Sequence, residues 1–149
     1  MAQTYFGSAL RSGSGTLTDT TDGGFVVLMQ TSTVTTAAAG TATSTSVVIP
    51  EDSQIIDIII DQVQNEVVGA GTATAINATV GTAAAGTQYV SATDVIGGGR
   101  AALTFTAAQL AAMADVGSNT SVFLTVDPDG TIVTTQGIYR LTVVYAQKG

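Results

Sequence analysis

The stretch VVIPEDSQIIDIIIDQVQNEVV, residues 47–68, decides the fold class. Pro50–Ser53 is expected to turn the chain, because proline fixes φ and acidic side chains bond to the nearby backbone. The segment Ile55–Val63 is then rich in β-branched residues, which favour a strand. Its period of two puts Ile56, Ile58 and Ile60 on one face, and Ile55, Asp57, Ile59 and Asp61 on the other. We therefore expect one face wholly in the core and an amphipathic second face, as at a sheet edge or a subunit boundary.

Further strands are predicted on both sides of this stretch. Residues 25–33 alternate, with Val27 and Met29 facing opposite to Val26 and Leu28. The same reading applies to TATSTSVVIP (41–50), TATAINATVG (72–81), TQYVSATDV (87–95), TSVFLTVD (120–127) and GIYRLTVVYA (137–146). The turn DPDG, Asp127–Gly130, is expected to lead from one of the last two strands to the other.

The string TAAAGT occurs twice, at residues 36–41 and 82–87. Three alanines cannot nucleate a helix, and each copy ends in a glycine that permits a reversal of the backbone. Both copies are therefore predicted to connect the strands of β-hairpins. An internal duplication and a chance match in a Thr/Ala/Gly-rich chain remain open as explanations.

One helix is predicted at Thr106–Ala114, within FTAAQLAAMA. Thr106 and Gln109 have the spacing of a capping box, and Leu110 and Met113 supply the apolar side. Many short strands with Gly-rich turns indicate an all-β protein. We expect an antiparallel β-sandwich or jelly roll of about eight strands, with this short helix and an extended N-terminal arm.

The chain has 149 residues, enough for one domain with a real core, which we place at residues 25–149. Residues 1–24 are rich in Gly, Ser and Thr, and predict a flexible or extended arm. Either this segment is a frayed terminus, or it lays Tyr5 and Phe6 onto a neighbouring molecule. Only 10% of residues are charged and mean hydropathy is +0.40, which suggests that part of the surface is covered by other subunits.

Composition argues against several classes of function. The net charge is −7 with four basic residues, so the clustered cations of a nucleic-acid binder are missing. No apolar run approaches the roughly 20 residues of a membrane span, and we expect no secretory signal at the start. Histidine and cysteine are absent, which removes the commonest general base, thiol nucleophiles and the usual transition-metal ligands. We expect no cofactor and no enzyme activity.

Three patterns in the sequence are candidates for chemical sites. Asp57 and Asp61 share a strand face but stand about 13 Å apart, too far for a glycosidase pair, so they are interpreted as solvated carboxylates. The sequence DPDGT, residues 127–131, starts like a calcium loop but has Ile138 at the twelfth position. A weaker calcium site with Asp19 or Asp22 stays open. GGGR, residues 97–100, lacks the rest of a P-loop and predicts a flexible loop whose Arg100 pairs with an acidic neighbour.

A resemblance enters with residues 45–95 and with the closing strand GIYRLTVVYA. They resemble small virion proteins of tailed bacteriophages, in which an I-P-x-x-x-x-I-x-D-I/V strand pair precedes a strand ending in Val-Gly, a short loop and Y-V-S/T. The residues that carry the likeness are Ile49, Pro50, Ile55, Asp57, Ile58, Val80, Gly81, Tyr89 and Val90. The likeness covers roughly the C-terminal two-thirds of the chain and leaves the N-terminal arm out.

The resemblance implies a jelly-roll capsid decoration (cement) protein, a homotrimer on the outer capsid surface of the virion that binds the major capsid protein lattice. Tyr5, Phe6, Asp57, Ile59 and Asp61 are then the candidate interface residues. The alternative is a head-fibre or tail module that binds a receptor or carbohydrate, and a β-sandwich hydrolase is the third hypothesis. A carbohydrate site needs exposed aromatic rings, whereas most Tyr and Phe residues here occupy strand positions that we expect to be buried.

Overall fold

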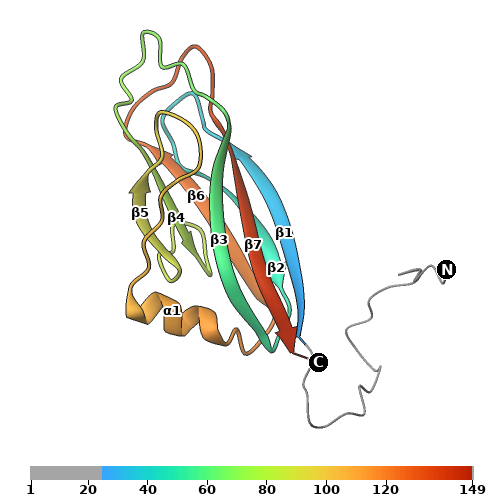
Figure 1. Ribbon diagram of the computed structural model, residues 1–149. Helices are drawn as coiled ribbons and strands as arrows, with labels where there is room; N and C mark the ends of the chain where they lie inside the picture. Colours follow the sequence, from blue (N-terminus) through green and yellow to red (C-terminus); the bar gives the residue numbers. More distant parts are fainter. Residues whose placement is uncertain (1–24, 149) are drawn as a thin grey trace, which may run out of the picture.

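The computed structural model describes residues 25–148, and this part of the chain is an all-β sandwich with one short helix (Figure 1). Its elements are β1 (Phe25–Thr35), β2 (Thr43–Ile49), β3 (Ser53–Gln64), β4 (Ile76–Gly81), β5 (Val90–Asp94), α1 (Ala107–Ala114), β6 (Thr120–Pro128) and β7 (Ile138–Lys148). The predicted fold class is confirmed. The arm expected at residues 1–24, with Tyr5 and Phe6, lies outside the described residues.

Two antiparallel sheets make up the sandwich, with strand orders β1-β7-β3 and β2-β6-β4-β5. The pairs β1 with β7, β2 with β6 and β4 with β5 nest inside one another, as in a long hairpin that is rolled up. The fourth nested pair joins β3 to residues 99–101, where Gln62 N donates to Gly99 O (2.8 Å) and Ala101 N to Ile60 O (2.9 Å). This is a jelly-roll order in which one strand is reduced to a single bridge, so the described residues form seven strands rather than about eight.

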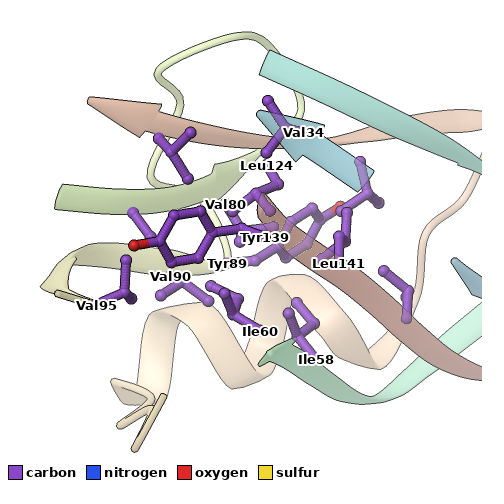
Figure 2. Close-up of a cluster of buried hydrophobic side chains, with 14 of the residues drawn as sticks. Val34, Ile58, Ile60, Val80, Tyr89, Val90, Val95, Leu124, Tyr139 and Leu141 are labelled. Carbon is purple, nitrogen blue, oxygen red and sulfur yellow. The ribbon is translucent and has the colours of Figure 1, made fainter. Parts of the chain in front are cut away.

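The core lies between the two sheets and consists of the inward-facing residues of both. Figure 2 shows part of it, where Ile58 and Ile60 of β3 meet side chains from both sheets. The largest fully buried side chains are Tyr139, Ile49, Ile60, Ile76, Leu124, Ile132 and Leu141. Burial of this set is the main force that holds the sheets together.

The register of β3 corrects one prediction. Ile55 pairs with Tyr145 and Asp57 with Val144, so Ile56 is an extra residue that forms a β-bulge. The bulge reverses the alternation at its N-terminal side: Ile55 is 2% exposed, whereas Ile56 is 50% exposed. The placement of Ile56 in the core and of Ile55 on the opposite face was therefore wrong, while Ile58 and Ile60 are buried as predicted.

The two TAAAGT copies play different roles. Residues 82–87 connect β4 to β5, which pair directly, so the predicted hairpin is confirmed there. Residues 36–41 lead from β1 to β2, which belong to different sheets, and the hairpin prediction was wrong for this copy. Thr36 starts the crossing: it is buried, and its backbone N donates to Gly137 O while its hydroxyl accepts from Gly137 N, both at 2.9 Å. This double contact holds the crossover against the start of β7.

The helix has the predicted capping box, in which Gln109 N donates to the Thr106 hydroxyl (3.3 Å) and Thr106 N to Gln109 Oε1 (2.9 Å). Met113 is buried as expected, but Leu110 is exposed, and the prediction for that residue was wrong. Gln109 takes the inner position instead, because its amide also donates to Thr87 O and to the Ser91 hydroxyl. These hydrogen bonds from Gln109 thus fix which side of α1 faces β5.

Candidate functional site

The candidate site is the outer sheet face, by which we mean the side chains of β1, β7 and β3 that point away from the β2-β6-β4-β5 sheet. The strand register arranges them in rows: Met29–Val144–Asp57, Thr31–Thr142–Ile59 and Thr33–Arg140–Asp61. Three candidate residues from the sequence, Asp57, Ile59 and Asp61, therefore occupy one face in consecutive rows. The structure places them together, as their spacing predicted.

Large apolar side chains are exposed at one end of this face. Val27 is 60% exposed and Met29 70%, both on β1, and Ile56 is 50% exposed on β3. Half-buried Val144 stands between Met29 and Asp57, and Ile56 is the neighbour of Asp57 in β3, so each of the three strands has an apolar residue at this end, with Asp57 among them. Scattered exposed apolar residues are normal on a protein surface, but a contiguous group on a rigid sheet marks an interaction surface.

Sequence reasoning missed the part of β7 in this surface. Val144 and Arg140 belong to GIYRLTVVYA, which was read as a core strand without assigning its two faces. The alternation of that strand carries the signal: Leu141, Val143 and Tyr145 share the core face, while the strand register puts Arg140, Thr142 and Val144 on the other face, where Thr142 is itself buried. The same alternation in β1 singles out Val27 and Met29.

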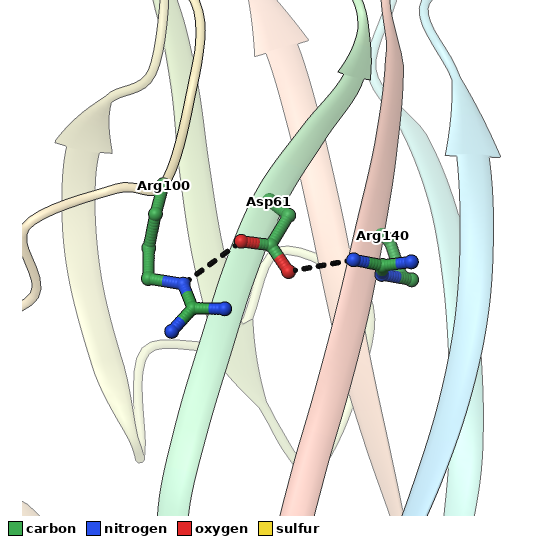
Figure 3. Close-up of polar contacts among 3 residues, drawn as sticks. All are labelled: Asp61, Arg100 and Arg140. Carbon is green, nitrogen blue, oxygen red and sulfur yellow. Dashed lines mark hydrogen bonds and ion pairs between the residues drawn. The ribbon is translucent and has the colours of Figure 1, made fainter.

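At the other end of the face Asp61 links two arginines (Figure 3). Arg100 Nε lies 2.9 Å from Asp61 Oδ1, and Arg140 Nη2 lies 3.0 Å from Asp61 Oδ2. These two hydrogen-bonded guanidinium groups hold the pKa of the Asp61 carboxyl below its usual value. The expected pairing of Arg100 with an acidic neighbour is confirmed.

The glycine-rich loop brings Arg100 to this position. Gly97, Gly98 and Gly99 all have positive φ, a conformation that favours glycine, and the loop is hydrogen-bonded to β3 on either side of Asp61. A hollow of about 160 Å³ lies beside it, lined by Asp57, Ile59, Arg100, Leu103 and Phe105 among others. Ligand cavities usually measure about 300–1,000 Å³, so this hollow is small for an organic ligand.

The carboxylates have structural partners that explain their positions. Both oxygens of Asp61 are engaged by arginine, and Asp57 Oδ1 accepts a hydrogen bond from Ile58 N at 2.8 Å. In the DPDGT segment, Asp127 and Pro128 continue β6, and Asp129 accepts from Thr74 N (2.7 Å), the Thr74 hydroxyl and Ala75 N. Those bonds lower the pKa of Asp129 and tie it to the residues just before β4.

Within residues 25–148, no group of three or more acidic side chains lies close enough to hold a metal ion. Asp19 and Asp22, the further ligands considered for a calcium site, fall outside that range. Among the described residues, the one helix has eight residues, far fewer than the roughly 20 that a membrane-spanning helix needs.

A second polar cluster, which was not predicted, connects the buried Tyr139 to the half-buried side chains of Gln62 and Glu66. The Tyr139 hydroxyl, on a fully buried ring, donates to Glu66 Oε2 at 2.9 Å and accepts from Gln62 Nε2 at 3.0 Å. Burial and the neighbouring carboxylate raise the pKa of Tyr139 far above its usual value, so it stays protonated as a donor. Tyr89, Tyr139 and Tyr145 are all buried, as expected for the strand tyrosines.

Comparisons with protein-family models, with curated proteins and with solved structures found no match.

Proposed function

We propose that this chain is a bacteriophage virion structural protein of the capsid decoration type, a homotrimer that binds the major capsid protein lattice on its outer surface. The observation that carries the proposal is the outer sheet face, where Val27, Met29 and Ile56 expose apolar surface on a rigid three-stranded sheet. The jelly-roll order of the strands and the resemblance of residues 45–95 to small phage virion proteins support it. A fold by itself hosts many functions, so the surface carries the argument.

The energetics favour a protein that binds in many copies. Burying the exposed part of Val27, Met29 and Ile56 contributes about 1–2 kcal/mol each, from the usual value per apolar side chain. Association costs about 4–15 kcal/mol in lost translational and rotational freedom and in ordering. One face is therefore a weak binder, and joined copies that dock together gain affinity through effective concentration.

The proposed mechanism is adhesion without covalent chemistry. A copy that contacts two neighbouring shell subunits at once binds the assembled lattice and not the separate subunits. Binding to one state shifts the equilibrium toward that state, so decoration stabilises the shell against expansion and disassembly. At the apolar end of the outer sheet face few charged groups need to lose water when the contact forms, and at the other end Asp61 is already paired with Arg100 and Arg140.

A binding assay on shells tests the proposal. Empty shells built from the capsid protein encoded beside this chain are mixed with the purified protein and sedimented. The protein is expected to sediment with the shells, and Ile56→Lys is expected to weaken this binding because it places a charge on the outer sheet face. Ala92→Lys makes the same charge change on β5, at an exposed position away from that face, and is expected to bind normally.

Absence of binding to shells, together with binding to a glycan or host receptor, would replace decoration by the receptor-binding function. Equal binding by Ile56→Lys and wild type would remove the outer sheet face from the proposal.

A further inference from the structure

The first fifth of the described residues, from Phe25 to Pro50, carries no charge. From Gly23 to Pro50 the chain contains no Asp, Glu, Lys or Arg, and every charged residue between positions 25 and 148 follows Pro50. These residues form β1, the first TAAAGT crossover and β2. A surface normally carries about a quarter of its residues as charged ones, so a neutral segment of this length needs a physical reason.

This neutral segment forms one side of the sandwich, which we call the open flank: residues 25–49. β1 is an edge strand of one sheet and β2 an edge strand of the other. The two lie next to each other, since the Ser32 and Thr45 hydroxyls are hydrogen-bonded and the Thr43 hydroxyl donates to Thr35 O at 2.8 Å. Figure 1 shows β1 and β2 along the same side, away from β5. The open flank thus offers two strand edges at once.

Both edges are regular and unprotected. β1 pairs with β7 over its whole length from Phe25 to Thr35 without a register shift, and β2 pairs with β6 in the same way. Neither strand contains proline or a charged residue, and within residues 25–148 no further strand covers its outer side. Folded proteins usually guard such edges with charges, proline, bulges or short strands, because free backbone groups recruit other strands.

The other edges of this molecule carry those protections. On β3 two bulges interrupt the pairing, and the bridge at residues 99–101 with the Arg100–Asp61 ion pair covers the outer side. β5 has five residues and ends at Asp94. The contrast within one chain indicates that the open flank is covered by a partner that needs a regular, neutral edge.

We infer that the open flank is the surface through which copies of this chain meet. The chain carries a net charge of −7, so two copies that approach through most other surfaces bring carboxylates together. At the open flank they bring no carboxylates together, and the unpaired strand edge of each copy can pair with that of the other. Pairing edge to edge satisfies backbone groups and removes Val27, Met29 and their neighbours partly from water. This inference rests on the homotrimer of the proposed function and deepens it by naming the surface that joins the copies.

Native mass spectrometry and analytical ultracentrifugation of the full chain test the inference. The wild type is expected to be a stable oligomer. The double variant Ser46→Lys/Val48→Lys puts two charges on exposed positions of β2, away from the outer sheet face, and is expected to dissociate at least about 100-fold more readily, because these charges lose water or meet like charges at the contact. Ala92→Lys on β5 serves as the matched control and should keep the oligomer.

Hydrogen exchange on the wild type gives a second readout that needs no variant. If copies meet at the open flank, the amides of β1 and β2 that point away from β7 and β6 are also protected. A monomeric wild type, rapid exchange of those amides, or a double variant that keeps both its fold and its oligomer would overturn the inference. Oligomers that form as expected but do not bind shells would instead contradict the proposed function alone.

Discussion

The bulge at Ile56 allows a sharp test of the β3 register. Because Ile55 and Asp57 pair with consecutive residues of β7, deleting Ile56 leaves every other residue of β3 on its present face. The deletion removes a half-exposed side chain worth about 1 kcal/mol of burial and straightens the ladder, which returns about 0.5–1.5 kcal/mol per added hydrogen bond. We expect the free energy of unfolding to change by no more than about 1.5 kcal/mol.

Deletion of Ile58 is the matched control, because no bulge absorbs it. Its loss forces one half of β3 to slide by a residue, which moves either Asp57 or Asp61 to an inward position. Losing a buried isoleucine costs about 2–5 kcal/mol, and an unpaired buried carboxylate costs several more. Small domains are stable by about 5–15 kcal/mol, so this variant should be unfolded or nearly so.

Urea unfolding followed by circular dichroism measures both variants. Similar large losses for the two deletions, or a larger loss for Ile56 than for Ile58, would show that the β3 register is not as described.

Three further perturbations have expected outcomes. Thr106→Ala removes the N-cap of α1 and should cost about 1 kcal/mol in urea unfolding, while Thr106→Ser should restore most of it; no difference between the two would contradict the capping box. Tyr139→Phe removes one of the three hydrogen bonds that Glu66 accepts, and should cost about 1–3 kcal/mol in urea unfolding because the acceptor is a carboxylate; an unchanged free energy of unfolding would contradict a contribution from this bond. Asp61→Asn should lower the free energy of unfolding at neutral pH, because the pKa of Asp61 is lower in the folded than in the unfolded chain and its contribution is complete above the unfolded pKa. The difference in stability from wild type should disappear as pH falls through the folded pKa, and should shrink in high salt. A difference that grows toward acid pH would contradict the lowered pKa.

Much of the architecture follows from local sequence patterns. β-branched alternation located the strands around Ile58, Leu124 and Leu141, and the Thr106–Gln109 spacing located the helix start, because these signals depend on neighbours within a few residues. The expected burial of Ile58 and Ile60 followed from the same period.

The errors arose where distant partners decide the outcome. Ile56 is turned outward by a mismatch with Tyr145 and Val144, which lie some ninety residues away in the chain. Leu110 is exposed because Gln109 is held by Thr87 and Ser91 of another element. The first TAAAGT crosses between sheets because Thr36 is bonded to Gly137, and nothing in six identical letters distinguishes that copy from the second.

In the outer sheet face too, local patterns predicted the residues of one strand but not their neighbours on other strands. Asp57, Ile59 and Asp61 were expected to share a face, because residues two apart in a strand always do unless a bulge intervenes. The partners in the adjacent strands, Met29 and Arg140, required the sheet order, which no local pattern encodes.

The central claim is that the chain acts by adhering to an assembled shell. Cryo-microscopy of particles from the phage that we propose as the source of the chain tests this most directly. We expect density for the β-sandwich on the outer surface of the head, with the β1-β7-β3 face against the capsid lattice and the open flanks of neighbouring copies in contact. Particles that lack the chain, or that carry it with the outer sheet face turned to solvent, would contradict the account.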